Sequence, residues 1–275
     1  VQGGKIHDWF YHGVGEEPII SIPMENKTGF EPALYVMRGE PDYKEGFAEE
    51  TFSATWCFPS EPGSAYAGRQ QKLFSRVTLA GSPEQAAFLL NTYPDPGKHS
   101  LMVRHEGTNP PFVAVHEAYI DKATATDVRI LPGDAVAVVQ ITHADGNKRL
   151  AIYESGSGPE GLNLVGRFGA IELNTFGQPR SLILVHGKEL CYGGIRIRAN
   201  RDITLSIIFN DKSIRLESSP SVAYETQEGQ PVYESGQDTT IWLDLPSHGS
   251  KTGKNTQILV PGQTKNGPVS VDVQW

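Results

Sequence analysis

The densest group of chemically capable side chains lies near the start of the chain, in HDWFYHG at residues 7–13. Its two histidines, its aspartate and its three aromatic rings are residue types that bind metals, stack on sugars or transfer protons. If the stretch is a strand, His7, Trp9 and Tyr11 share one face and His12 lies on the other. One metal ion could not easily take both imidazoles unless a bulge bends the strand near Tyr11. We therefore favour strand packing over a metal or catalytic site.

Other motifs of metal or nucleophilic chemistry are missing from the sequence. The remaining histidines show neither H-x-x-x-H nor H-E-x-x-H spacing, and there is no G-x-S-x-G elbow and no P-loop. The glycine-rich SGSGPEG at 155–161 is interpreted as a turn because no helix follows it. The neighbouring carboxylates of Glu49 and Glu50 would face opposite ways in a strand, which makes them a poor pair for glycoside hydrolysis. The sequence thus predicts no catalytic group and no cofactor, although a metal site built from distant residues would leave no such pattern.

Aromatic rings remain as candidates for binding a sugar. Four tryptophans occur, at positions 9, 56, 242 and 275. Trp56 is better explained as core, because in TFSATWCF at 51–58 its alternating neighbours are apolar. Trp9 and Trp242 lie on expected strands with mixed faces, so either ring could be exposed to a sugar. The candidate substrate-binding residues are therefore His7, Trp9, Tyr11, His12 and Trp242.

The elements that must position these residues are β-strands. Alternation of apolar and polar residues, punctuated by turn residues, predicts strands near 32–38, 71–79, 85–92, 99–105, 111–117, 134–143, 149–154, 181–186, 202–209, 213–217, 239–245 and 268–274. Asp145-Gly146 in ITHADGNKRLAIYE predicts a hairpin turn. SPEQAAFLL at 82–90 could start a helix at its serine, but we favour a turn that runs into a strand. The predicted fold is all-β: a large antiparallel β-sandwich, as one unit or as two stacked ones.

Composition narrows the classes of partner. The 275 residues are 38% hydrophobic, enough for a substantial core without a disulfide framework, and the two cysteines are either one bridge or two thiols. A formal charge of -8 argues against a nucleic-acid partner, which needs clustered Lys and Arg. No apolar run approaches the roughly 20 residues that span a bilayer. A local basic pocket could still bind an acidic sugar.

Two stretches together resemble a known family. VQGGKIHDWFYHG at 1–13 and KHSLMVRHEGTNPPFVAVHEAY at 98–119 resemble the β-sheet region of bacterial heparinase II/III-like polysaccharide lyases, a group that includes exo-acting alginate lyases. LVHGKELCYGGIRI at 184–197 is compatible with a later part of that region. The resemblance covers residues 1–200. Residues 201–275 are expected to be further strands of the same sandwich or a small appended β module.

The resemblance implies that the catalytic groups and the structural metal site lie in different domains. In that family an N-terminal α/α toroid supplies most catalytic groups for β-elimination at uronic acids, and the sheet region holds a structural zinc. The zinc ligands, an H-x-H followed by an aspartate, precede the segment that corresponds to GGKIHDWF. Because this chain starts at Val1, after that point, we expect it to lack both the toroid and the zinc ligands. We therefore transfer no catalytic role to His7, His12 or His116, and we expect His116 to be buried and hydrogen-bonded.

Two functions of different classes follow as hypotheses. The first is a non-catalytic β-sandwich part of a bacterial polysaccharide lyase, secreted or periplasmic, that supports the absent toroid and binds acidic polysaccharide. It predicts an uncovered apolar patch where the toroid docks. The alternative is a stand-alone lyase that acts on uronic-acid-containing glycans by β-elimination. A structural module without a ligand is a third and weaker option. Neither main hypothesis involves nucleic acid or a membrane.

Overall fold

The chain is built from antiparallel β-strands. The computed structural model describes residues 6–13, 17–28, 43–58, 72–91, 99–107, 111–209, 213–220, 222–225, 231–233, 239–245, 254–260 and 269–274. Within these residues the regular elements are strands and one short 3-10 turn, Pro159–Gly161 (η1), and no helix is long and apolar enough to cross a membrane. Three sheets have four or more strands, and β18 (Val222–Glu225) pairs with β19 (Pro231–Tyr233) in a separate ribbon. The predicted all-β, antiparallel class is confirmed.

The chain divides into two compact units. The first is Val1–Arg129 with Ile141–Ala144, and the second is Ile130–Gln140 with Asp145–Trp275. The predicted division after residue 200 stays a prediction. Residue 200 itself lies inside a continuous strand, β16 (Ile195–Phe209).

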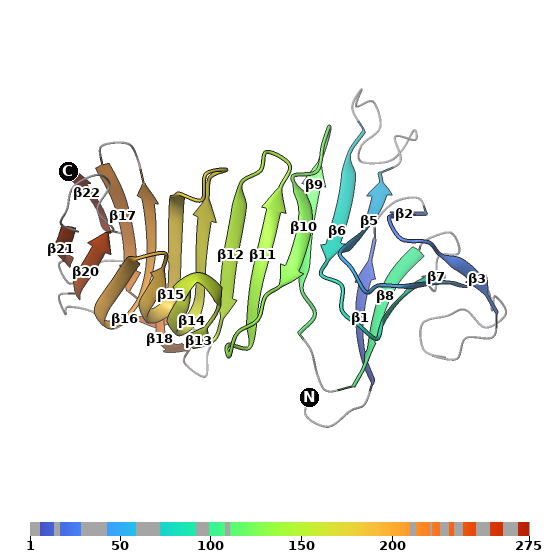
Figure 1. The fold of residues 1–275 in the computed structure, drawn as a ribbon, viewed down its shortest axis with the longest axis horizontal. Helices are drawn as coiled ribbons and strands as arrows, with labels where there is room; N and C mark the ends of the chain where they lie inside the picture. The colour runs from blue at the N-terminus through green and yellow to red at the C-terminus, as the bar shows by residue number, and fades with distance from the viewer. Residues whose placement is uncertain are drawn as a thin grey trace. The chain divides into compact units, whose positions relative to one another are not determined.

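The first unit contains two sheets that face each other (Figure 1). A five-stranded sheet has the order β1 (Ile6–His12), β8 (His99–Glu106), β7 (Gln85–Asn91), β4 (Tyr43–Phe47) and β3 (Glu25–Lys27). A four-stranded sheet has the order β2 (Ile19–Ile20), β5 (Phe52–Cys57), β6 (Phe74–Leu79) and β9 (Ala114–Tyr119). Their inner faces share one core, in which Trp56 of β5 packs with Leu101 and Val103 of β8. This unit is therefore a β-sandwich.

Strand periodicity explains why these residues pack as they do. Phe52, Ala54 and Trp56 alternate with polar residues along β5 and are almost completely buried, as the sequence predicts. In β8 both faces are apolar. Leu101 contributes to the core between the sheets, while Met102 packs with Phe88 and Leu90 on the opposite face.

The eleven-stranded sheet is built differently from this two-sheet sandwich. Its main order is β10 (Ala125–Ile130), β11 (Ala137–His143), β12 (Lys148–Tyr153), β14 (Asn163–Leu173), β15 (Pro179–Tyr192), β16, β17 (Ser213–Pro220) and β22 (Val269–Gln274). The shorter β13 (Gly156–Ser157) pairs with β14. Alongside β16 lies β20 (Thr239–Leu245), which also pairs with β21 (Lys254–Val260).

The long strands of this sheet change partner or register halfway along. The pairing of β14 with β15 shifts at Gly166, and that of β15 with β16 shifts around Gly187. On one side of these shifts β16 pairs with β20 through Arg196–Ala199, and on the other side it pairs with β17 through Ile203–Phe209. Bulges of this kind bend strands. The sheet can therefore fold over one core.

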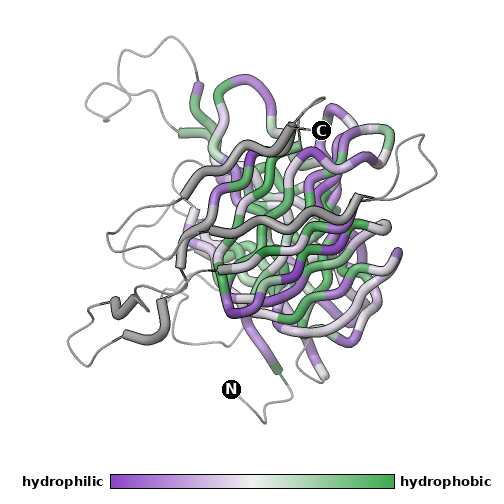
Figure 2. Tube along the Cα trace, turned by 90° about the vertical axis from the view of Figure 1, so that its left-hand side faces the viewer, coloured by the Kyte–Doolittle hydropathy of each residue, from purple (hydrophilic) through white to green (hydrophobic). Residues whose placement is uncertain are grey.

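That core joins both halves of the bent strands. It includes Leu164, Leu190 and Ile197 from before the shifts together with Ile171 and Ile207 from beyond them. Figure 2 shows hydrophobic and hydrophilic positions following one another along the strands, as expected where one strand face is buried and the other is not. The outward side chains of β15, β16 and β20 are thus left to face solvent, and they position the site below.

Most of the predicted elements are confirmed. Each predicted strand from 71–79 onward overlaps a strand of the structure, whereas the one near 32–38 lies outside the described residues. SPEQAAFLL is a turn that leads into β7, and Gly146 takes a φ of 83° in the predicted hairpin turn. Cys57 and Cys191 are both free thiols. Several strands are not predicted from the sequence, of which β10 and β14 are the clearest.

Candidate functional site

The predicted residues of β1 lie at two faces of the five-stranded sheet. Trp9 and Tyr11 point into the sandwich and pack against its core, with ring centroids 6.1 Å apart and planes inclined by 6°. The Tyr11 hydroxyl lies 3.0 Å from Ser75 Oγ. His12 faces the other way, with its Nδ1 2.6 Å from Ser100 Oγ. The two histidines of HDWFYHG therefore do not converge.

His116 corrects one expectation. It shares the inward face of β9, as the sequence suggests, and its ring lies 5.0 Å from Tyr11 and 6.1 Å from Trp9. The prediction that it is buried is wrong, because the residue is exposed. β9 is the last strand in the order of its sheet, so no described neighbouring strand covers the ring on that side.

His7 belongs to a row of polar residues across the five-stranded sheet. It lies opposite His105 of β8, which in turn lies opposite Gln85 of β7. His105 and Gln85 are 7% and 5% exposed, and His105 Nε2 lies 3.4 Å from Ser82 Oγ. Among the described residues, no group of three or more His, Cys, Asp or Glu side chains could hold a metal ion. We interpret this row as the polar end of the sandwich interior.

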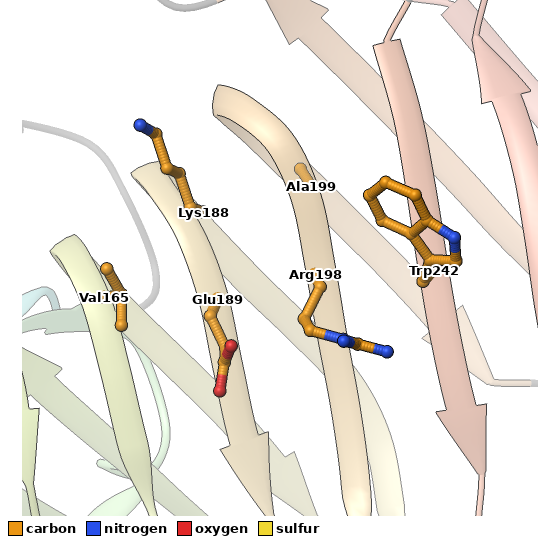
Figure 3. Close-up of a pocket in the computed structure, with 6 residues that line it drawn as sticks. All are labelled: Val165, Lys188, Glu189, Arg198, Ala199 and Trp242. Atoms are coloured by element: carbon orange, nitrogen blue, oxygen red, sulfur yellow. The ribbon is translucent and has the colours of Figure 1, made fainter.

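Trp242 occupies a different setting, a shallow pocket on the outer face of the second unit. The pocket has a volume of about 250 Å³ and is lined by Val165, Lys188, Glu189, Arg198, Ala199 and Trp242. These residues come from four adjacent strands, β14, β15, β16 and β20. Figure 3 shows the indole on one side, Val165 and Lys188 on the other, and Ala199 between them. The pocket thus combines one flat ring with three charged groups.

Strand register explains why these side chains meet. Val165 lies opposite Glu189, Glu189 opposite Arg198, and Arg198 opposite Trp242. Cross-strand neighbours on one face of a sheet lie close enough to interact. Ala199 follows in β16 and also lines the pocket, while its side chain packs against the core of the unit. We call this group the Trp242 pocket.

The carboxylate of the pocket is already engaged. Glu189 accepts hydrogen bonds from both Nε and Nη2 of Arg196, at 3.1 and 3.0 Å, and from the Cys191 thiol at 3.3 Å. Burial opposes its ionisation, but these bonds outweigh that effect and hold the pKa of Glu189 below its ordinary value. Glu189 is thus an ionised acceptor within an ion pair.

The neighbouring thiol is correspondingly inert. Burial, followed by the hydrogen bond to Glu189, raises the pKa of Cys191 to about 11. Thiols react as thiolates, so Cys191 is not a nucleophile near neutral pH. The pocket offers groups for binding, and none of them is poised as a base or a nucleophile.

Sequence reasoning found one residue of this pocket and missed the others. Lys188, Glu189 and Arg198 lie in LVHGKELCYGGIRI, which was noted only for its resemblance to a family. The alternation of Arg196, Ile197 and Arg198 was the available signal, because it places both guanidinium groups on one strand face. Their meeting with Trp242 depends on long-range pairing that a sequence does not display.

The comparisons with known proteins add no assignment, since neither the scan of protein-family models nor the search of curated proteins finds a match to this chain.

Proposed function

We propose that this chain is the non-catalytic β-sandwich part of a bacterial polysaccharide lyase, secreted or periplasmic, which supports an α/α toroid domain and binds acidic polysaccharide. The observation that carries the proposal is the Trp242 pocket, where an indole lies beside the cations of Lys188 and Arg198. The resemblance of residues 1–200 to the heparinase II/III-like lyases supports the family part of the proposal.

The groups of the pocket suit an acidic sugar. An indole offers a flat apolar surface for the C–H face of a pyranose ring, and its edge stays in contact with water. Lys188 and Arg198 supply positive charge against a carboxylate, despite the acidic character of the whole chain. Small-ligand sites commonly combine an apolar wall with a few placed polar groups.

The state of the acidic group favours binding over catalysis. β-Elimination at a uronic acid needs a base within about 3 Å of the C5 hydrogen and a neutralised carboxylate. Glu189 is held by Arg196 and Cys191, so it is not available as that base. The catalytic groups are therefore proposed to lie on the toroid.

An apolar patch supports the scaffold part of the proposal. On the outer face of the second unit, Tyr153, Phe168 and Val185 lie in one cross-strand row, and Ile183 lies in the next. Tyr153, Ile183 and Ile208 of this face are 42%, 38% and 41% exposed. Contiguous exposed apolar side chains mark surfaces that bind other proteins or domains. We propose that this patch contacts the toroid.

One experiment separates binding from turnover. The chain is incubated with alginate, heparin, heparan sulfate, chondroitin and hyaluronan, and the absorbance of unsaturated uronate is followed while binding is measured by calorimetry. We expect heat of binding with at least one glycan and no rise in absorbance. Turnover by this chain alone would favour the stand-alone lyase and overturn the proposal. The absence of both signals would contradict glycan binding.

A further inference from the structure

We infer that the Trp242 pocket selects a single sugar residue that carries one carboxylate and no sulfate. This inference rests on the proposed function, since it concerns the glycan bound at the same site. It follows from the charges around the pocket and from its size.

Four of the five charged groups in and beside the pocket are paired. The Glu189 carboxylate is bound by both nitrogens of the Arg196 guanidinium. Arg198 Nη2 lies 3.6 Å from Asp244 Oδ2. In the part of the chain that the structure describes, only Lys188 of these five has no ion-pair partner. The group as a whole therefore has one net positive charge.

One unpaired cation matches one anionic group. A uronate carboxylate near Lys188 would neutralise the pocket. A sulfated residue would bring further negative charge close to the Glu189 and Asp244 carboxylates, which repel it. Repulsion by fixed like charges is a common source of specificity. The arrangement therefore accepts one carboxylate and selects against a residue that carries a sulfate in addition to it.

The remaining donors suit hydroxyl groups. At 3.6 Å, Arg198 and Asp244 are too far apart for a direct hydrogen bond. The Arg198 guanidinium thus keeps donors for neutral oxygens of a sugar, and the Glu189 carboxylate faces the same side of the pocket (Figure 3). Hydroxyl groups both donate and accept, so they can satisfy this mixed pair.

The size of the pocket limits what it holds to about one ring. Its volume of about 250 Å³ lies below the roughly 300–1,000 Å³ of pockets for drug-sized ligands. Ala199 lies between Lys188 and Trp242 (Figure 3). A ring over Ala199 would lie against the indole and near the ammonium group, with the rest of the glycan outside.

The test compares three oligosaccharides of equal length with the full chain by isothermal titration calorimetry. They are an unsulfated oligomannuronate, a sulfated heparin fragment and a neutral β-glucan. We expect the oligomannuronate to bind best and the heparin fragment to bind at least about tenfold more weakly. Lys188→Gln should weaken oligomannuronate binding roughly fivefold. The matched control Lys148→Gln, at an exposed position of β12, should leave it unchanged.

Each other outcome has a distinct meaning. If the heparin fragment binds as tightly as the oligomannuronate, the inference is overturned but glycan binding stands. The same holds if the neutral glucan binds as tightly as the oligomannuronate and its affinity is unchanged by Lys188→Gln. If none of the three binds, the proposed glycan-binding function fails as well. Trp242→Ala keeps every charge and removes the aromatic wall of the pocket, so it should weaken oligomannuronate binding about tenfold. Retained binding in that variant would place the sugar elsewhere and contradict the inference.

Discussion

Trp9 and Trp242 are the same residue type in opposite surroundings. Trp9 stacks on Tyr11 and packs against a core of buried apolar side chains. Trp242 is flanked by Arg198 in the next strand and lines an open pocket. Both residues are half-buried, and the sequence predicts mixed faces for both strands but not which ring lines a pocket. That difference comes from the neighbouring strands, whose side chains are apolar around Trp9 and charged around Trp242.

Trp242→Ala should therefore weaken the binding of unsulfated oligouronates by about tenfold, because it removes the stacking surface of the pocket. The measurement is calorimetric titration, with the thermal midpoint as a check on folding. Phe176→Ala is the control, since Phe176 is an aromatic residue that is 87% exposed in a distant turn. Equal affinity of the Trp242 variant and the wild type would contradict the assignment.

Glu117 has a structural role at the residue scale. One of its carboxylate oxygens accepts bonds from Thr124 N, Thr124 Oγ1 and Ala125 N at 2.7, 2.6 and 2.9 Å. Burial opposes ionisation, but these bonds outweigh it and hold the pKa of Glu117 below its ordinary value of 4.5. The carboxylate thereby fixes the chain as it turns from β9 into β10.

The pH dependence follows from this lowered pKa. Glu117 contributes its full stabilisation above the unfolded-state pKa near 4.5, and the contribution is lost as the pH falls through the lower folded-state value. Glu117→Gln should reduce the free energy of unfolding by about 1–2 kcal/mol at pH 7 and by less in acid. Urea titrations at several pH values measure both effects. The exposed Glu50→Gln is the control, and an equal loss in both variants would contradict the assignment.

At the scale of elements, the backbones of β14 and β15 are in close contact where their register shifts. A Cβ built on Gly166 would lie 2.5 Å from Gly187 Cα and 2.9 Å from the His186 carbonyl oxygen. The neighbouring His186 has a φ of 47°, which is unusual for a residue with a side chain. The bend that lets the sheet fold over its core therefore depends on two glycines.

Gly166→Ala should destabilise the protein by about 1–3 kcal/mol, since the added methyl group meets backbone atoms that cannot easily move. Gly177→Ala is a useful comparison. Gly177 has a φ of 76° and nothing within 4 Å of its Cβ position, so only backbone strain applies there. Thermal denaturation distinguishes the two. A Gly166 variant as stable as the wild type would show that the strands separate without cost.

Prediction from sequence succeeds for elements whose pattern is local. β5 alternates clearly, and the Asp145-Gly146 turn has the residues that a hairpin needs. β14, NLVGRFGAIEL, mixes apolar residues with glycines and an arginine, so its alternation is weak. Its inner face becomes evident only when it pairs with β12 and β15. Length, bends and change of partner depend on those pairings.

At the scale of the whole molecule, the predicted site residues separate into two units. His7, Trp9, Tyr11 and His12 belong to the first unit and Trp242 to the second. A linear sequence carries no signal for such a division when strands continue through it. The all-β class is predictable because almost every segment shows strand chemistry. The pocket is not, since its charges and its indole meet only through the pairing of β15, β16 and β20.

Indole resonances in nuclear magnetic resonance spectra test the central claim most directly, because the chain has four tryptophans and each gives one signal. The Trp242 signal is assigned by its loss in Trp242→Phe. On addition of an unsulfated oligouronate, we expect the Trp242 signal to shift in a saturable manner while the signal of buried Trp56 stays in place. An unmoved Trp242 signal at millimolar oligosaccharide would contradict glycan binding at this pocket.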